Sequence, residues 1–367
     1  MTKKKILIAT GGTGGHIFPA LSLAKNLTKK NYNVQLTVDK RALKYLEEYQ
    51  NLNLIKITSS PFIKTNIFKF LWSSIKIFFS IIKSVFLLLF NRPSLIFGMG
   101  GYASFPVCIA AAILKIKFII YENNLIIGKA NKYLLPFAEK IFVSFNDLEG
   151  ISDRNQKKKI EVGNIVREEI INSSIKNITF DEIKILVLGG SQAAKIFAES
   201  LPQVFKKVKE SGFSIKIFQQ CQPGQNEKLS KFYKKENIDY EIFNFTNRII
   251  DYYSKANLVI TRSGASALGE ILNFRLPFIA IPLPNSADNH QFKNAIYYEK
   301  KGYGYLLEEI NITKHLHNLI ISIATDKTKI QRIISNQRQY SDKEIFKKLN
   351  INIEKILSLK DCYLLQN

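Results

Sequence analysis

At 367 residues the chain is long enough to form two domains, each with its own hydrophobic core. Hydrophobic residues make up 46% and charged residues 23% of the sequence, which is the composition of a globular protein. The formal net charge of +23 allows nucleic acid, an anionic membrane or an anionic substrate as a partner. We expect no nucleic acid, because no RRM, KH, zinc-finger or basic-helix pattern occurs and the heavy use of Lys, Ile and Asn fits an AT-rich genome.

The cysteines and the N-terminal residues indicate the compartment. Cys108, Cys221 and Cys362 lie far apart and lack metal-ligand spacing, which favours reduced thiols in the cytosol. The first residues lead directly into a strand and a glycine loop, which is not the pattern of a signal peptide.

The first predicted strand, Ile6 to Thr10, runs into the glycine loop GGTGGH and then a helix predicted from Pro19 to Lys30. Glycines let the backbone come close to a ligand, and the start of a helix attracts anions. The spacing is not GxGxxG, so a nicotinamide-dependent dehydrogenase is only a weak alternative. His16, at the end of this loop, could accept a proton from a sugar hydroxyl, or else cap the helix or position a phosphate.

The segment from Ile67 to Phe90 is strongly apolar but contains a lysine every seven residues. No uncharged run approaches the ~18 to 20 residues that cross a bilayer. On a helix, the lysines and three serines are predicted to share one narrow polar face: Lys69, Ser73, Lys76, Ser80, Lys83 and Ser84. The wide apolar arc predicts partial contact with lipid through a membrane patch of Lys69, Trp72, Lys76, Phe79 and Lys83. A buried helix pair with one wet edge is the alternative.

A second strand and glycine loop follow in the same half of the chain. The strand Ser94 to Gly98 leads into GMGGY, which ends at Tyr102. The two loops are expected at the same edge of one sheet, where a single pyrophosphate-bearing ligand could use both. Beyond a further strand, Glu122 is a second candidate base or a carboxylate that holds a loop, and Arg167 is suited to a diphosphate leaving group.

The second half repeats this plan. The strand Ile185 to Leu188 precedes GGSQ, so two nucleotide-binding-type α/β units are predicted in tandem. A later strand ends in TRSGA, where a helix begins and can bind a pyrophosphate. Glu270, about two turns further on, can accept hydrogen bonds from ribose hydroxyls, and the DNHQ loop with His290 and Gln291 suits the hydroxyls of a sugar. This order predicts a nucleotide-sugar pocket.

The motifs GGTGGHxFPA, GMGGY, GNIVR, GGSQ, RSGxxxxxE and DNHQ occur in the order found in the MurG family of GT-B glycosyltransferases, which the chain resembles over nearly its whole length. The resemblance implies an α/β GT-B fold of two Rossmann-like parallel-sheet domains with the active site in the cleft between them. Residues 1–165 would form the acceptor- and membrane-binding domain, with a C-terminal helix at 345–367 packing back on it. Residues 166–344 would form the UDP-sugar-binding domain.

The resemblance also implies the roles of individual residues. Within it, His16 keeps its place as the candidate base by its own chemistry, with Glu122 as the weaker candidate. Contacts to UDP-N-acetylglucosamine (UDP-GlcNAc) are implied for Thr13, Gly14, Gly15, Asn124, Arg167, Ser191, Thr246, Ser263, Gly264, Ala265, Ser266, Glu270, His290 and Gln291. The acceptor's pyrophosphate is implied at Gly11, Gly12, Gly100, Gly101 and Tyr102. The chain departs from the family pattern at Tyr121, Asn123, Ile165, Ala193 and Ala267.

The implied reaction is the lipid I to lipid II step of peptidoglycan synthesis. It is an inverting transfer of N-acetylglucosamine from UDP-GlcNAc to the 4-hydroxyl of N-acetylmuramyl-(pentapeptide)-pyrophosphoryl-undecaprenol. We expect no cofactor and no obligatory metal, because no DxD-like carboxylate pair is present. The expected location is peripheral, on the anionic cytoplasmic face of the bacterial inner membrane, with cell-wall synthesis proteins as candidate partners. A transferase acting on diacylglycerol and a non-catalytic nucleotide-sugar binder stay open as alternatives.

Overall fold

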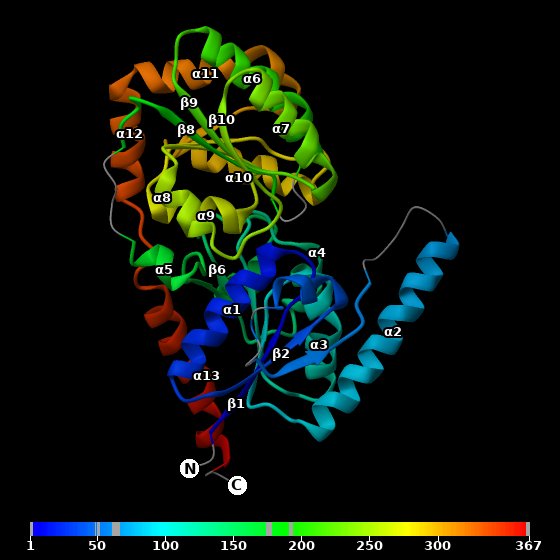
Figure 1. The fold of residues 1–367 in the computed structure, drawn as a ribbon. Helices are drawn as coiled ribbons and strands as arrows, with labels where there is room; N and C mark the ends of the chain where they lie inside the picture. The colour runs from blue at the N-terminus through cyan, green and yellow to red at the C-terminus, as the bar shows by residue number, and fades with distance from the viewer. Residues whose placement is uncertain are drawn as a thin grey trace. The chain divides into compact units, whose positions relative to one another are not determined.

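The computed structural model describes residues 3–47, 49, 52–60, 67–173, 178–190 and 194–364. The chain forms two compact units. Unit 1 comprises Met1–Val166 and Lys343–Asn367, and unit 2 comprises Arg167–Asp342. The boundary expected from the sequence lies within one residue of the first division, and the C-terminal helix α13 (Ile345–Leu364) belongs to unit 1, where it packs against α1 (Figure 1).

Unit 1 is built on a seven-stranded parallel sheet in the order β3-β2-β1-β4-β5-β6-β7. Its central strands are short runs of mostly apolar residues buried on both faces, which is typical of parallel sheets. They are β1 (Lys5–Ala9), β2 (Asn33–Val38), β3 (Leu54–Lys56), β4 (Leu95–Gly98), β5 (Phe118–Glu122), β6 (Lys140–Val143) and β7 (Lys159–Glu161). The helices besides α13 are α1 (Gly14–Lys29), α2 (Ile67–Phe90), α3 (Gly101–Ile113) and α4 (Lys129–Leu134).

Unit 2 has a six-stranded parallel sheet in the order β10-β9-β8-β11-β12-β13. The strands are β8 (Ile183–Leu188), β9 (Ile215–Gln220), β10 (Asp239–Phe243), β11 (Leu258–Thr261), β12 (Phe278–Ala280) and β13 (Tyr305–Leu306). The helices are α5 (Glu168–Ile171), α6 (Lys195–Glu210), α7 (Asn226–Lys235), α8 (Ile249–Lys255), α9 (Ala265–Phe274), α10 (His290–Lys300), α11 (Ile312–Thr325) and α12 (Lys327–Arg338). The predicted α/β class with two parallel-sheet units is therefore confirmed.

Helix α1 begins five residues earlier than predicted. The sequence suggested Pro19 as its start because proline favours the first helical position. The structure begins the helix at Gly14 and places Pro19 inside it. The second glycine pair of GGTGGH therefore belongs to the first turn of the helix.

Helix α2 corrects a second prediction. The serines expected beside the lysines on a polar outer face are buried, and together with Ile77 and Leu88 they form the stripe that packs toward α3: Ser73, Ser80 and Ser84. The lysines lie along one border of this stripe and are exposed. The opposite face is apolar and open, with Phe68, Leu71, Trp72, Ile75, Phe78, Phe79, Phe86, Leu89 and Phe90 exposed. Small hydroxyl side chains allow close packing because each can bond a backbone carbonyl, as Ser84 does to Ser80.

Candidate active site

The central strand of unit 1 marks a topological switch point. Strand β1 lies between β2 and β4, so the loops that follow β1 and β4 leave the sheet at the same edge. The two loops are in contact, because His16 Nδ1 at the end of the first lies 2.9 Å from the Met99 carbonyl oxygen in the second. Their predicted juxtaposition is thus a feature of the structure.

His16 lies against the second glycine loop. Its Nδ1 is 2.9 Å from the carbonyl oxygen of Met99, to which it donates a hydrogen bond when the ring is neutral. In that tautomer Nε2 has the lone pair. Cβ atoms added to Gly100 or Gly101 would come within 3.4 Å and 3.3 Å of the ring, and both glycines have positive φ values of 84° and 72°. The backbone conformation therefore favours glycine here, and a side chain would also crowd the His16 ring.

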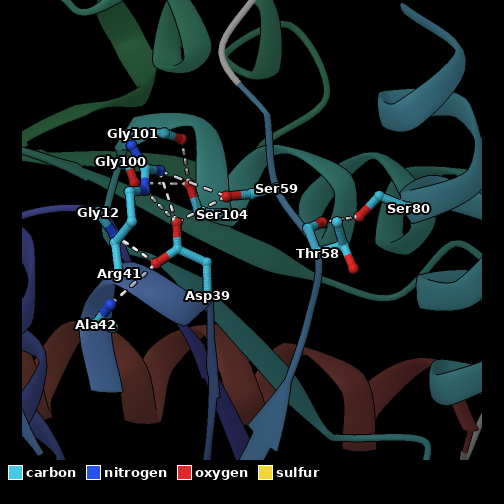
Figure 2. A network of polar contacts seen from close by, with 10 residues as sticks. All are labelled: Gly12, Asp39, Arg41, Ala42, Thr58, Ser59, Ser80, Gly100, Gly101 and Ser104. Carbon is cyan, nitrogen blue, oxygen red and sulfur yellow. Dashed lines mark hydrogen bonds and ion pairs between the residues drawn. The ribbon is translucent and has the colours of Figure 1, made fainter. Parts of the chain in front are cut away.

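A carboxylate that the sequence analysis did not select braces the first loop. Asp39 follows β2, is 4% exposed, and accepts hydrogen bonds from the Gly12 and Ala42 N–H groups through Oδ1 (Figure 2). Its Oδ2 accepts from Arg41 and Ser59. Burial alone would raise the pKa of Asp39, but these hydrogen bonds and the guanidinium outweigh it and lower the pKa. The sequence indicated at most an N-cap, since Asp after a strand is favoured there, and did not point to the glycine loop.

Glu122 is engaged in holding the loop after β5. One carboxylate oxygen accepts the backbone and side-chain N–H groups of Asn124, at 3.1 and 2.8 Å, and the other accepts from Gly128 and Asn131, both at 2.9 Å. The side chain is 4% exposed. These contacts favour the loop-holding alternative for Glu122 and place Asn124, the candidate donor contact, beside it.

Tyr121 lies where the family pattern usually has histidine, and its hydroxyl forms hydrogen bonds with neighbouring segments of unit 1. It donates to the Gly163 carbonyl at 3.1 Å, accepts from the Ile165 N–H at 2.9 Å, and lies 2.9 Å from the hydroxyl of Ser144. The side chain is 2% exposed. The tyrosine ties β5 to the GNIV segment, in which isoleucine replaces proline.

Unit 2 has the corresponding switch point at β8, which lies between β9 and β11. The loop after β11 contains Ser263, whose side chain is fully buried and whose hydroxyl has no hydrogen-bond partner among the described residues. Next to it, Gly264 is the N-cap of α9, and no side chain among the described residues caps this helix. An orphaned hydroxyl beside open helical N–H groups fits an anion such as a phosphate.

Arg167 and Glu270 were predicted to serve different parts of the donor, yet the structure pairs them. Arg167 donates through Nε at 2.9 Å and Nη2 at 2.6 Å to the two carboxylate oxygens of Glu270, and through Nη1 to the Asn247 carbonyl. The buried hydroxyl of Tyr253 lies 3.3 Å from Glu270. Burial, and then the negative charge of Glu270, raises the pKa of Tyr253. The carboxylate is thereby fixed about 7.5 Å along α9 from its start, at 1.5 Å per residue.

The DNHQ loop has an unusual backbone. Asp288 and Asn289 both have left-handed conformations, with φ values of 50° and 55°. Such strain in two successive residues other than glycine is typical of functional sites. His290 donates from Nδ1 to the Ala287 carbonyl, and the Gln291 carbonyl oxygen accepts the Leu283 N–H at 3.0 Å. The Gln291 amide nitrogen has no partner in the described part of the chain and is available to a ligand.

The remaining predicted residues are distributed as follows. Thr13 is the N-cap of α1, with Gly14 and Gly15 in its first turn. The Thr246 hydroxyl accepts the Arg248 N–H at 3.0 Å. Ser191 and Ala193 lie outside the described residues. Ala265 and Ser266 open α9, and Tyr102 lies in the first turn of α3.

Comparisons with known proteins agree with this architecture. The profile of the Glycosyltransferase family 28 N-terminal domain matches residues 6–143, and that of the family's C-terminal domain matches residues 184–349. Among solved structures, Acinetobacter baumannii MurG has a TM-score of 0.74 at 24% identity, covering 96% of this chain and 99% of that one. The UDP complex of S. aureus MnaA has a TM-score of 0.70 at 14% identity, with 97% of each chain covered. At these identities the structures establish the fold.

Two curated relatives share more of the sequence. Both have the name UDP-N-acetylglucosamine–N-acetylmuramyl-(pentapeptide) pyrophosphoryl-undecaprenol N-acetylglucosamine transferase. The Pelagibacter ubique (strain HTCC1062) protein is 34% identical over 358 residues, which is 97% of this chain and 99% of the relative. The Rickettsia canadensis (strain McKiel) protein is 36% identical over 361 residues, 96% of this chain and all of the relative. A match of this identity along both chains shows that the protein belongs to the MurG family of glycosyltransferases.

Proposed function

We propose that the protein transfers N-acetylglucosamine from UDP-GlcNAc to the 4-hydroxyl of N-acetylmuramyl-(pentapeptide)-pyrophosphoryl-undecaprenol, with inversion at C1. Donor binding is supported by the buried hydroxyl of Ser263, which has no hydrogen-bond partner among the described residues. It lies at the start of α9, which no described side chain caps and which also carries Glu270. The α9 start would bind the diphosphate, and Glu270 would accept the ribose hydroxyls. Gln291 and His290 would contact the sugar.

Arg167 is proposed to position Glu270. The bidentate ion pair fixes the carboxylate orientation. Oε1 keeps a lone pair for a ribose hydroxyl, whereas Oε2 also accepts from the Tyr253 hydroxyl. The sequence-based role of Arg167 at the leaving diphosphate is the competing proposal. The two roles differ in their dependence on Glu270, which a double variant measures.

In unit 1, His16 is the proposed base. The 4-hydroxyl oxygen attacks C1 of the donor sugar, the bond from C1 to the UDP oxygen breaks, and the hydroxyl proton passes to His16 Nε2. The hydrogen bond between Nδ1 and Met99 supports this role, because it orients the ring and favours the tautomer with a basic Nε2. The acceptor's pyrophosphate would bind at the two adjoining glycine loops. We propose that the protein's own cations and helix starts stabilise the leaving UDP, with no obligatory metal.

A peripheral position on the cytoplasmic face of the inner membrane is proposed for α2. The helix Phe68–Phe90 is long enough to cross a bilayer, and its most apolar 18-residue window has a mean hydropathy of 1.9 and is 28% buried. The packing of the Ser73, Ser80 and Ser84 stripe supports a helix lying on the surface instead, because spanning would expose these hydroxyls to lipid. The open apolar face would enter the lipid and the bordering lysines would meet anionic headgroups.

The test is transfer of labelled N-acetylglucosamine from UDP-GlcNAc to a short-chain, lipid-linked muramyl-peptide acceptor, with diacylglycerol in parallel and with and without a chelator. Transfer to the muramyl acceptor alone, insensitive to the chelator, is expected. Transfer to diacylglycerol instead would assign the protein to the alternative acceptor. Donor binding without transfer to either lipid would make it a nucleotide-sugar binder, and loss of turnover with the chelator would refute the metal-independent mechanism.

A further inference from the structure

Arg41 has no part in the proposed mechanism so far, yet its guanidinium lies at the first glycine loop. Its Nε and Nη2 donate to the same oxygen of Asp39, at 2.8 and 2.6 Å (Figure 2). A Cβ added to Gly12 would lie 3.6 Å from Nη2. The side chain is 50% exposed, so the guanidinium is open to solvent on its other side.

The charge of Asp39 makes this arginine significant. The carboxylate is buried and its pKa is lowered, so it is ionised at neutral pH. It lies directly beneath the loop, because a Cβ on Gly11 would be 3.0 Å from its carboxyl carbon. Asp39 also accepts the hydrogen bond of the Gly12 N–H, so this donor is not left for the acceptor's pyrophosphate, which the sequence predicted at Gly12. An anion that approaches this loop therefore meets a fixed negative charge, which only a nearby cation can offset.

The guanidinium has donors left for a ligand. The guanidinium of Arg41 has five N–H groups. One on Nε and one on Nη2 donate to Asp39, and Nη2 also lies 3.5 Å from the Ser59 hydroxyl. Nη1 has no partner among the described residues. A planar guanidinium held along one edge presents its other N–H groups in a fixed direction, which suits recognition of phosphate oxygens.

We propose that Arg41 binds the diphosphate of the lipid-linked acceptor through Nη1, and that Asp39 is its positioning residue, holding the guanidinium and the Gly12 N–H in one arrangement. The inference rests on the proposed function, since it deepens the acceptor site of that reaction. The same phosphate chemistry is offered by an anionic lipid headgroup, which is the competing source.

The experiment compares steady-state kinetics of wild type, Arg41→Ala, Arg41→Gln and Arg41→Lys with two short-chain acceptors, one linked through a diphosphate and one through a monophosphate. Arg41→Ala should raise the KM for the diphosphate acceptor about 10- to 100-fold, as loss of a hydrogen bond to a charged group does. The KM for the donor and kcat should change less than about twofold, and the preference for the diphosphate acceptor should collapse. Arg41→Lys should restore part of the affinity.

Controls separate binding from folding. Lys40→Ala removes the same charge one residue away and should leave both KM values unchanged. If Arg41→Ala fails to fold because Asp39 loses its partner, Arg41→Gln keeps a donor for Asp39 without the charge and gives the answer. Asp39→Asn should raise the acceptor KM by a smaller factor, and its effect should vanish in the Arg41→Ala background.

Several outcomes would overturn the inference. If Arg41→Ala lowers the Tm but leaves the acceptor KM unchanged, Arg41 only stabilises the fold and does not bind the acceptor. Loss of sedimentation with phosphatidylglycerol vesicles, but not with phosphatidylcholine vesicles, at unchanged acceptor KM would assign the arginine to headgroups. Wild type that fails to use either acceptor would refute the proposed function itself, whereas wild-type turnover with an insensitive Arg41 refutes this inference alone.

Discussion

The two units have the same switch-point topology but use arginine in opposite ways. In unit 1, Arg41 is half exposed beside the loop after β1. In unit 2, Arg262 occupies the loop after β11 and is 8% exposed, donating to the carbonyls of Ile281 and Pro282, pairing with Glu309 and lying 4.7 Å from the centre of the Phe197 ring. The buried arginine holds its own loop together, and the start of α9 that follows it is the proposed diphosphate site. The exposed one keeps donors for a ligand.

The largest effect should separate the two histidines of the predicted site. His16→Asn in unit 1 can still donate to Met99 but has no basic nitrogen, so kcat should fall about 10²- to 10⁴-fold, the usual contribution of a general base. His290→Asn in unit 2 should mainly raise the donor KM. Rapid-quench measurement of a single turnover checks both. A His16→Asn enzyme with more than a tenth of wild-type kcat would move the base role elsewhere, with Glu122 next to be tested.

The second effect concerns the Arg167–Glu270 pair. Glu270→Gln should lower kcat/KM for the donor about 100-fold, because losing a ribose hydroxyl's hydrogen bond to a charged carboxylate costs about 1.5 to 3 kcal/mol. Glu199→Ala, which breaks the exposed pair with Lys195, is the matched control in the same unit.

The double variant decides what Arg167 does. If Arg167 positions Glu270, adding Arg167→Ala to Glu270→Gln should produce little further loss. Losses that add in full would show that Arg167 contacts the diphosphate independently. Fluorescence titration with UDP provides the binding constants.

A smaller effect is expected at the open face of α2. Trp72→Ser combined with Phe79→Ser should weaken binding to anionic vesicles about 10-fold or more, since burial of each such side chain contributes about 1.5 to 3 kcal/mol. Turnover of a water-soluble acceptor should be unaffected. Ile310→Ser, at an apolar residue in unit 2 that is even more exposed, is the control. Unchanged vesicle sedimentation would refute the lipid-facing role of α2.

The smallest effect is a pH dependence of the free energy of unfolding, which arises from Asp39 in unit 1. Because the pKa of Asp39 is lowered in the folded protein, its contribution to stability is present above the ordinary value of 3.8 and is lost as the pH falls through the folded-state pKa. The difference in free energy of unfolding between wild type and Asp39→Asn should be about 1 to 3 kcal/mol at pH 7 and should shrink below pH 4. Urea titrations at both pH values measure it. A difference independent of pH would contradict an ionised Asp39.

The sequence by itself determined the two-unit α/β fold and most of the loops at the sheet edges. Apolar strand runs, glycine loops and helix starts are local patterns, and residues such as His16, Gly100 and Ser263 were selected because they lie directly in such patterns. The start of α1 was misplaced because a proline after the first turn imitates a helix start.

Only the tertiary structure decided which side chains meet. Asp39 was passed over because nothing near it in sequence shows that Gly12 and Ser59 lie within hydrogen-bond distance. Arg167 and Glu270 are separated by 103 positions, so each was read alone. In α2 the helical period correctly aligned the lysines and serines, but which side faces the core depends on the surface of α3. Periodicity fixes the angle between residues on a helix, whereas packing against a neighbour fixes which angle is buried.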